Sequence, residues 1–406
     1  MSEIPQGGAA PMQRLVGSVR NYEWGSLEFI PNLLGKPADN KPQAEYWLGA
    51  HLSSPSKIEI AGTSYDLAEW LKTNPQALGN QARARFGSEL PFLVKVLSAR
   101  VPLSLQAHPN ARDAASGFAK ENEQGISLDD PKRTFKDPHH KPELIIALTP
   151  FDALVGFRDP NETLDLFDRL GVKTSLEPII GPLRHRSGQA GMAEVFLDVL
   201  TINDERIALA NEVVSAAVGH VQDEGDLGEF ARTAVLLDEY FPNDPSLIAA
   251  LLLNRRHLEP GEGLHVREGT MHAYLSGSGV EVMASSDNVL RGGLTRKHID
   301  VDALVQVVNF RSEIAPILHP TPVSEGVCEY RIDEDAFRVW RISPSKFLGV
   351  LPASDTARII LATEGQISMF CKDENLKLER GQSAFLPAGE EIGFTGTGQA
   401  FLSASG

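Results

Sequence analysis

The sequence predicts a mainly β protein that contains an inserted α-helical domain and two β-barrels of one kind. Short apolar runs bounded by turn residues dominate residues 1–155 and return after the helical part. Between them, stretches such as residues 206–221 place apolar side chains at three- and four-residue spacing, the period of an amphipathic helix. Residues 258–272 also align without gaps with residues 378–392. A repeated strand-and-turn unit predicts two related barrels.

These observations divide the chain into four segments. We expect the first barrel to comprise residues 1–155 and 255–325. A helical domain at residues 156–254 interrupts it, and residues 326–406 form the second barrel. Strands on both sides of the helical insertion must therefore meet in the first barrel.

The strongest strand signal in the first part of the chain is residues 90–97, which include a single cation, Lys95. A lysine inside an apolar strand needs a partner or a pocket, or it lies at a sheet edge and discourages aggregation. Trp24 belongs either to the core or to the wall of a sugar site. The usual burial of aromatic side chains favours the core.

Residues 102–109, PLSLQAHP, predict a strand with one polar face. Side chains two residues apart on a strand point the same way, so Ser104, Gln106 and His108 share a face. Leu103 then lies on the opposite face. A hydroxyl, an amide and an imidazole on one face are typical of a polar pocket, although His108 alone would more simply be a buried or turn histidine.

Two further segments supply partners for His108. Glu143 begins the strand-like run of residues 144–148, and His272 directly precedes another apolar run. Each residue alone has a plain structural interpretation, as a solvated strand start or a turn residue. Together with Gln106 they make a set of two nitrogen and two oxygen ligands that suits zinc or a similar divalent ion. With one carboxylate and three neutral ligands, such an ion stays positively charged and is a good Lewis acid.

The internal repeat predicts that only the first barrel binds metal. In the second copy Ile392 occupies the position of His272, so a ligand is missing there. Both copies keep two glycines eight residues apart, namely Gly261 with Gly269 and Gly381 with Gly389.

Residues 279–295 contain a second group of candidate residues. Glu281 lies in a strand-like alternation, and a polar turn leads from there to Arg291. The glycine pair at residues 292–293 would let the backbone approach a ligand closely. Arg291 could stabilise a phosphate or an enediolate, or it could pair with Asp287 in a surface loop.

Composition excludes several function classes. The chain of 406 residues has a formal net charge of −16, which argues against nonspecific binding to nucleic acid or to anionic membranes. An anionic substrate would need locally concentrated Lys and Arg. The two cysteines imply neither a disulfide framework nor a cysteine metal site. Because no signal-peptide pattern or membrane-spanning run is present, we expect a cytoplasmic protein. Separately, we expect a monomer.

Several motifs, in order along the chain, resemble type I mannose-6-phosphate isomerases, the zinc-dependent phosphomannose isomerases of cupin fold. The repeat resembles the second cupin motif, with Pro387 at the usual proline position and Arg267 at the matching position of the first copy. The resemblance implies two cupin-like jelly-roll β-barrels plus a helical domain. It covers about residues 15–310 and depends on NYEWG, AEYWLGAHLSSPS, PLSLQAHP, HHKPELIIAL, HAYLSG and ASSDNVLRGGLT.

The resemblance also implies the roles of particular residues. The zinc ligands of the family fall on Gln106, His108, Glu143 and His272. Its essential active-site arginine falls on Arg291. These are the four ligands and the arginine that the residues themselves suggest.

The expected reaction interconverts mannose 6-phosphate and fructose 6-phosphate through a cis-enediol. Lys141, two residues before Glu143, is the first candidate base, and Glu281 is the second. A lysine base must be neutral, and a nearby metal ion would lower its pKa. A protonated Lys141 could instead bind substrate. The resemblance favours a pocket for Lys95, and the candidate substrate contacts are Lys95, Ser104, Trp24 and Asp287.

Two other function classes remain open at this point. One is a metal-dependent isomerase of free aldoses or of another phosphosugar. The other is a non-catalytic cupin that stores or senses sugar. Lys141, Glu281 and Arg291 argue against the second class, because simple binding needs no proton-transfer group.

Overall fold

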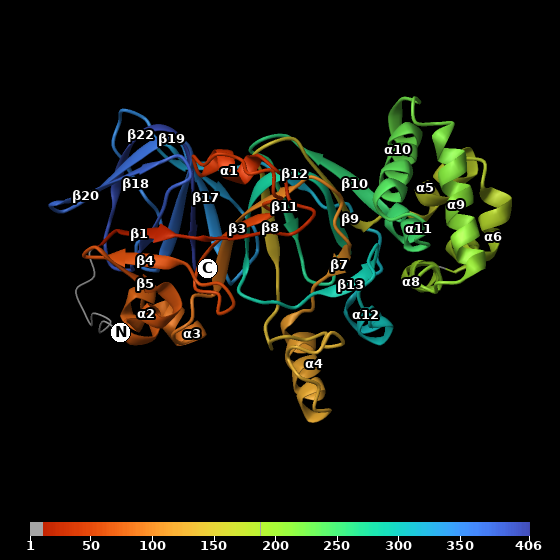
Figure 1. The fold of residues 1–406 in the computed structure, drawn as a ribbon, viewed down its shortest axis with the longest axis horizontal. Helices are drawn as coiled ribbons and strands as arrows, with labels where there is room; N and C mark the ends of the chain where they lie inside the picture. The colour runs from red at the N-terminus through yellow and green to blue at the C-terminus, as the bar shows by residue number, and fades with distance from the viewer. Residues whose placement is uncertain (1–10, 187) are drawn as a thin grey trace.

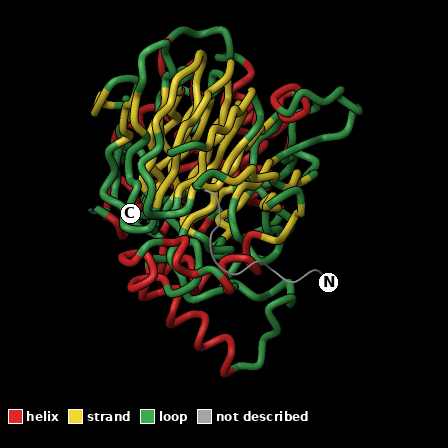
Figure 2. The backbone as a smooth tube through the Cα atoms, turned by 90° about the vertical axis from the view of Figure 1, so that its left-hand side faces the viewer, coloured by secondary structure: helices red, strands yellow, loops and turns green. Residues whose placement is uncertain are grey.

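The computed structural model describes residues 11–186 and 188–406 of the chain. Figure 1 shows three parts in a row: the C-terminal strands on the left, a second group of strands in the middle, and a group of helices on the right. Seen after a 90° turn, the strands lie in the middle of the molecule and helical segments lie below and behind them (Figure 2). The fold is therefore largely β with a separate helical part, as the sequence predicts.

The middle group of strands forms one sheet of eleven strands, which we call the site sheet. Its strands are β2 (Ser18–Arg20), β3 (Glu45–Leu48), β6 (Phe92–Ala99), β7 (Leu105–Ala107), β8 (Glu143–Ala147), β9 (Phe151–Phe157), β10 (Leu253–Leu258), β11 (Gly263–Val266), β12 (His272–Ala284), β13 (Leu290–Gly293) and β14 (Ile317–Leu318). The main path is β14-β11-β8-β12-β6-β3-β2, and the remaining strands join through β7 and β9 to β12. The long strand β12 is thus the centre of this sheet.

The second sheet also has eleven strands, and we call it the C-terminal sheet. It consists of β1 (Gln13–Val16), β4 (Lys57–Ile60), β5 (Thr63–Asp66), β15 (Thr321–Ser324), β16 (Val327–Tyr330), β17 (Arg338–Ile342), β18 (Gly349–Val350), β19 (Arg358–Cys371), β20 (Glu374–Glu379), β21 (Ser383–Leu386) and β22 (Gly393–Ala404). Strand β1 pairs with β21, with Gln13 opposite Phe385. The N-terminal segment therefore contributes strands to both sheets.

One hydrophobic cluster joins the two sheets. Leu144 and Ile146 of β8 belong to it together with Val339 and Leu361 of the C-terminal sheet. Because side chains alternate along a strand, Glu143 at the start of β8 points to the opposite face. The same strand thus gives one face to the core and the other to the candidate site.

Helices lie mainly between β9 and β10. Asp159 caps the first of them, since its carboxylate accepts hydrogen bonds from the backbone N–H groups of Asn161 and Glu162. None of the helices in the described ranges combines the length and apolar character needed to cross a bilayer. These helices are α5 (Pro160–Arg169), α6 (Lys173–Ile180), α7 (Pro182–His185), α8 (Gln189–Asp198), α9 (Asp204–Val218), α10 (Gly225–Tyr240) and α11 (Ser246–Leu251).

Other helices connect the strands elsewhere. Figure 1 shows α2 and α3 below the C-terminal sheet and α4 below the site sheet. The connecting helices are α1 (Phe29–Leu33), α2 (Leu67–Thr73), the 3₁₀ helix η1 (Pro75–Leu78), α3 (Asn80–Phe86), α4 (Ala111–Glu123) and α12 (Val301–Val307).

The repeat seen in the sequence has equivalent backbone hydrogen bonds in both copies. The N–H of Gly261 donates to the carbonyl of Ala147 at 2.8 Å. The N–H of Gly381 donates to the carbonyl of Ala362, also at 2.8 Å. Strand β11 begins two residues after the first glycine and β21 begins two residues after the second. Strand β8 therefore corresponds to the start of β19.

This correspondence matches Glu143 with an arginine. In the site sheet Glu143 lies opposite Val266 of β11. In the C-terminal sheet Arg358 lies opposite Leu386 of β21, the residue that the repeat aligns with Val266. A carboxylate in one sheet is thus replaced by a guanidinium in the other.

Arg358 is fully buried in the C-terminal sheet. Its guanidinium donates hydrogen bonds to the carbonyls of Pro352 at 3.2 Å and Glu390 at 2.9 Å. Burial lowers the pKa of Arg358 to about 10, so the group stays positively charged at neutral pH. Ile392, which the repeat matches with His272, packs in the hydrophobic core of the same sheet. The second copy therefore has a fixed cation and an apolar residue where the first copy has Glu143 and His272.

Candidate active site

Three of the four predicted metal ligands meet in the site sheet. The ligand atoms of His108, Glu143 and His272 all lie within 4.8 Å of one another, and the three residues are buried. His108 Nε2 is 3.3 Å from Glu143 Oε1, and His272 Nε2 is 3.6 Å from Glu143 Oε2. Strand β7 ends just before His108, while β8 and β12 begin at Glu143 and His272. The ends of three strands thus position the group.

Both imidazoles present Nε2 to the carboxylate because their Nδ1 atoms face carbonyl groups. His108 Nδ1 is 2.7 Å from the carbonyl oxygen of Asn288, and His272 Nδ1 is 3.0 Å from that of Thr270. A carbonyl only accepts, so each Nδ1 donates a proton, and Nε2 is the ring nitrogen left to face the carboxylate or a cation. Among the described residues, the buried Nε2 of His108 has no hydrogen-bond partner. An unsatisfied lone pair beside a carboxylate fits a divalent cation.

The protonation states of this group also suit a metal. Burial lowers the pKa of His108 to about 4, so its imidazole is neutral at pH 7. Burial raises the pKa of Glu143, but His108 and Lys141 outweigh it and hold that pKa well below its ordinary value. Lys141 Nζ lies 3.2 Å from Glu143 Oε1. A neutral imidazole, as at His108, and an ionised carboxylate are the forms that ligate metal ions.

Gln106, the fourth predicted ligand, lies beside the other three. The backbone of Gln106 pairs with that of His272 on β12 and with that of Arg291 on β13. Its amide nitrogen is 3.5 Å from the hydroxyl oxygen of Ser104. With the nitrogen directed to that hydroxyl, the amide oxygen is the atom left to approach a cation.

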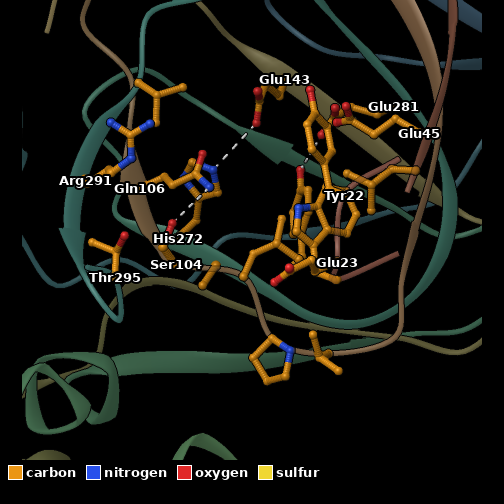
Figure 3. A pocket seen from close by; sticks show the side chains of 18 of the residues that line it. Tyr22, Glu23, Glu45, Ser104, Gln106, Glu143, His272, Glu281, Arg291 and Thr295 are labelled. Atoms are coloured by element: carbon orange, nitrogen blue, oxygen red, sulfur yellow. Dashed lines mark hydrogen bonds and ion pairs between the residues drawn. The ribbon is translucent and has the colours of Figure 1, made fainter. Parts of the chain in front are cut away.

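A cavity of about 670 Å³ extends from this group, within the usual size range of small-molecule sites. Figure 3 shows Arg291 on one side of His272, with Glu45 and Glu281 on the other side. His108 lies behind the wall, almost fully buried. The predicted site residues that line the cavity are Trp24, Lys95, Ser104, Gln106, Lys141, Glu143, His272, Glu281, Asp287 and Arg291.

Lys95 lies at the centre of a buried polar network in the cavity wall. Its Nζ is 3.5 Å from Glu45 Oε1 and 3.3 Å from Glu281 Oε2. The indole N–H of Trp47 donates to Glu45 at 2.9 Å, and the hydroxyl of Tyr274 donates to Glu281 at 3.0 Å. Strand β6 lies between β3 and β12, so the edge-strand interpretation of Lys95 is wrong.

The charges of this network depend on one another. Burial lowers the pKa of Lys95, but the carboxylates of Glu45 and Glu281 outweigh burial and raise it above its ordinary value. Burial and the neighbouring Glu143 raise the pKa of Glu281, whereas Lys95 lowers it. When all are ionised, these three carboxylates exceed the positive charge of Lys95 and Lys141. A bound divalent cation would reverse that local excess of negative charge.

Arg291 is a half-buried residue of β13 and does not lie in a surface loop. Asp287 is held by His51, with His51 Nε2 3.4 Å from Asp287 Oδ1. The predicted alternative, an Arg291–Asp287 pair, is therefore wrong, and Arg291 has no ion-pair partner in the described part of the chain. Burial lowers the pKa of Arg291, and burial together with Arg291 lowers the pKa of Lys297. Arg291 and Lys297 thus both line the cavity, and neither has an ion-pair partner among the described residues.

Two details differ from the sequence predictions. A β-carbon at Gly292 would lie 2.7 Å from Met271 Cε, and one at Gly293 would lie 2.5 Å from Ser246 Cβ. At both glycines the close neighbours are protein side chains, one of them from α11. Leu103 also lines the cavity, because β7 begins only two residues later and the strand alternation does not apply to it.

Aromatic residues complete the cavity wall. Trp24 stacks on Tyr22 with 5.7 Å between ring centroids, and both line the cavity. Trp24 is partly buried and also packs against a hydrophobic cluster of the site sheet, so it belongs to the cavity wall and to the edge of the core. Tyr240 and Phe241, at the end of α10, line it as well, and no local sequence signal indicates this. Tyr274 lies two residues along β12 from the ligand histidine, so strand periodicity could have identified it.

Comparisons with known proteins agree with this geometry. The family model described as phosphomannose isomerase type I, catalytic domain, matches residues 12–160. The mannose-6-phosphate isomerase of Escherichia coli is 37% identical over 384 residues, which cover 93% of this chain and 95% of that protein. The mannose-6-phosphate isomerase of Salmonella typhimurium is 38% identical over 393 residues, which cover 96% of this chain and 98% of that protein.

Solved structures are similar over the whole fold. A zinc-bound mannose 6-phosphate isomerase is 36% identical, with a TM-score of 0.88. The Salmonella typhimurium enzyme bound to its substrate fructose 6-phosphate and to zinc is 35% identical, also with a TM-score of 0.88. Each comparison covers 98% of this chain and 100% of the other chain.

Proposed function

The chain belongs to the type I phosphomannose isomerase family, and we propose that it interconverts mannose 6-phosphate and fructose 6-phosphate through a cis-enediol. The observation that carries this proposal is the meeting of His108, Glu143 and His272 beside a cavity that also contains Lys141 and Arg291. Moving a proton between carbons 1 and 2 of a sugar needs a base and positive charge near both oxygens. The cavity wall offers both.

Zinc is the cofactor that this site fits, and we infer that Gln106, His108, Glu143 and His272 hold it. The unpartnered Nε2 of His108 and the ionised Glu143 support this ligand set. Relatives of similar fold bind zinc. When bound, a divalent ion supplies Lewis-acid charge for the sugar oxygens.

We propose Lys141 as the group that moves the proton. Glu281, the second candidate, already uses both carboxylate oxygens, one with Tyr274 and the other with Lys95. Lys141 lines the cavity, and its Nζ lies 3.2 Å from Glu143 Oε1, beside the proposed ligand group.

Arg291 is proposed to stabilise negative charge on the enediolate. Its backbone lies opposite Gln106 in the β7–β13 pairing, which places it beside the ligand group. Figure 3 shows Arg291 on the opposite side of His272 from Glu281. A half-buried guanidinium without a countercharge is suited to an anion.

Four further residues are proposed to contact the sugar phosphate. Lys95 offers a buried positive charge and Ser104 a hydroxyl, and both line the cavity. Trp24 offers an aromatic face for the apolar face of the sugar, and Asp287 a carboxylate for its hydroxyl groups.

The architecture is proposed to be two cupin-like jelly-roll barrels. The equivalent glycine hydrogen bonds of the two sheets support this. We keep the division into residues 1–155, 156–254, 255–325 and 326–406, with the first segment lending β1, β4 and β5 to the C-terminal sheet. We also propose a monomer, which sedimentation should identify by a mass near 44.1 kDa.

Metal removal tests the function. The protein is treated with a chelator, dialysed, and assayed for fructose 6-phosphate formed from mannose 6-phosphate, with and without added zinc. We expect the activity to disappear on removal and to return with zinc. Full activity of the metal-free protein would overturn the mechanism. Equal turnover of mannose and mannose 6-phosphate would instead identify an isomerase of free aldoses.

A further inference from the structure

We propose that Asn288 is a positioning residue that orients His108 and thereby sets the affinity of the site for zinc. Asn288 is fully buried and directly follows Asp287 of the cavity wall. Its carbonyl accepts the Nδ1–H bond of His108 at 2.7 Å. This inference depends on the proposed metal site and extends it to a residue outside the ligand set.

The side chain of Asn288 fixes the position of that carbonyl. Its amide nitrogen donates to the carbonyl of Asp137 at 2.8 Å and to that of His139, also at 2.8 Å. Its amide oxygen accepts from the N–H of Lys136 at 2.7 Å. Both donors and the acceptor of the carboxamide are therefore used, which leaves it a single orientation.

The carboxylate of Asp137 also binds residues 286–287 to residues 137–139. It accepts from the hydroxyl of Ser286 at 2.8 Å and from the N–H of Asp287 at 2.7 Å. The N–H of His139 donates to the same carboxylate at 3.0 Å. Residues 136–139 and 286–288 thus bind each other through side chains of both segments, and we call this arrangement the Asn288–Asp137 clamp.

The clamp connects two of the metal ligands. Residues 136–139 lead directly to Lys141 and to Glu143 at the start of β8. The carbonyl at residue 288 holds His108, which follows β7. The imidazole and the carboxylate are therefore fixed relative to each other by hydrogen bonds that do not involve the ligand atoms.

Asn288→Asp removes the two donated hydrogen bonds with almost no change of shape. A carboxylate oxygen would then face the carbonyls of Asp137 and His139, and repulsion would displace residue 288 and its carbonyl. The Nδ1 of His108 would lose its fixed acceptor. Partners of metal-ligating histidines typically change metal affinity by about 10- to 100-fold when they are altered.

The test measures zinc affinity by competition with a chromophoric chelator, at a temperature where each variant is folded by circular dichroism. We expect Asn288→Asp to bind zinc about 10- to 100-fold more weakly than the wild type, and kcat to recover at saturating zinc. Asn74→Asp is the control. Asn74 is buried and donates to the carbonyl of Trp70 at 3.1 Å, but it lies outside the cavity wall, so its zinc affinity should not change.

Asp137→Asn provides a second variant of the clamp and decides the matter if Asn288→Asp does not fold. Wild-type zinc affinity in a folded clamp variant would overturn the inference. An equal loss of affinity in Asn74→Asp would also overturn it, because the effect would then follow from general destabilisation. Failure of the wild-type protein to bind zinc would instead overturn the proposed metal site itself.

Discussion

Replacing Lys95 with methionine tests whether the buried network balances its charges as the distances indicate. The ammonium of Lys95 lies between Glu45 at 3.5 Å and Glu281 at 3.3 Å, and its side chain is 8% exposed. Lys95→Met keeps most of the volume and removes the charge. Two buried carboxylates then lose the one ammonium that lies within 4 Å of them in the described part of the chain.

The expected loss of unfolding free energy depends on the hydrogen bonds that each carboxylate keeps in the variant. Glu45 retains its hydrogen bond from Trp47, and Glu281 retains its hydrogen bond from Tyr274. Breaking a buried ion pair by removal of one partner costs about 3–5 kcal/mol. Because both carboxylates keep one donor, we expect the lower end, about 3 kcal/mol of unfolding free energy at pH 8.

The sign of the pH dependence is also fixed. Burial and Glu143 already raise the pKa of Glu281, and loss of Lys95 raises it further. A carboxyl whose folded pKa lies above its unfolded pKa lowers stability as the pH rises through that interval. The deficit of Lys95→Met should therefore be largest at pH 8 and should shrink toward pH 5.

The assay is urea unfolding of wild type and variant at pH 8 and at pH 5, with Lys72→Met as a matched control. Lys72 Nζ lies 2.8 Å from Glu69 Oε1, a shorter distance than either ion pair of Lys95, but both side chains are 55% exposed. Exposed pairs contribute about 0–1 kcal/mol. The double variant Lys95→Met/Glu281→Gln should recover part of the loss, because it removes one unpaired charge.

Two results would refute the reasoning. One is an equal stability loss for Lys95→Met and Lys72→Met, since burial would then make no difference. The other is a deficit that stays constant between pH 5 and pH 8. Either result would mean that the carboxylates of the network are not charged in the folded protein.

Three further predictions concern single residues. Arg291→Ala should keep bound zinc, measured by metal analysis, and lose turnover by about 10²- to 10³-fold; unchanged turnover would exclude a catalytic role. Burial lowers the pKa of His265 to about 4, so the unfolded chain takes up a proton below about pH 6.5 that the folded chain does not. In urea unfolding, the free energy of unfolding should fall between pH 7 and pH 5 in the wild type, and the fall should be about 1–2 kcal/mol smaller in His265→Gln. An identical fall in both proteins would contradict this. Gly293→Ala should lower the thermal midpoint of unfolding more than the control Gly125→Ala does. Both glycines have positive φ, but only at Gly293 would the added carbon lie within 3 Å of a neighbouring side chain. Equal shifts would show that Ser246 moves freely.

The ligand group was predictable from the sequence because its members stand at strand ends with short-range signals. Glu143 precedes an apolar run and His272 precedes another, and the structure places both at the first residue of a strand. The position of Lys95 in a buried strand was equally visible. What the sequence left open was whether that strand lay at an edge, since this depends on which strands pair.

Other parts of the site depend on tertiary contacts that no local pattern encodes. Asp287 and Arg291 have compatible charges and a suitable spacing, yet His51, from a distant segment, holds the aspartate. Tyr240 lies at the end of a helix whose periodicity indicates only burial. Strand β1 pairs with β21 across nearly the whole chain, and register between such distant segments is set by packing.

The buried guanidinium of Arg358 has a consequence for how the two halves of the protein respond to their surroundings. In the site sheet a bound metal ion would add positive charge beside Glu143, and its removal leaves the buried carboxylates in excess over Lys95 and Lys141. In the C-terminal sheet the positive charge belongs to the Arg358 side chain itself, which donates hydrogen bonds to two backbone carbonyls. Chelation should therefore loosen the first half and leave the second unchanged. For the same reason, a histidine at position 392 would not create a second metal centre while a cation occupies the place of the carboxylate.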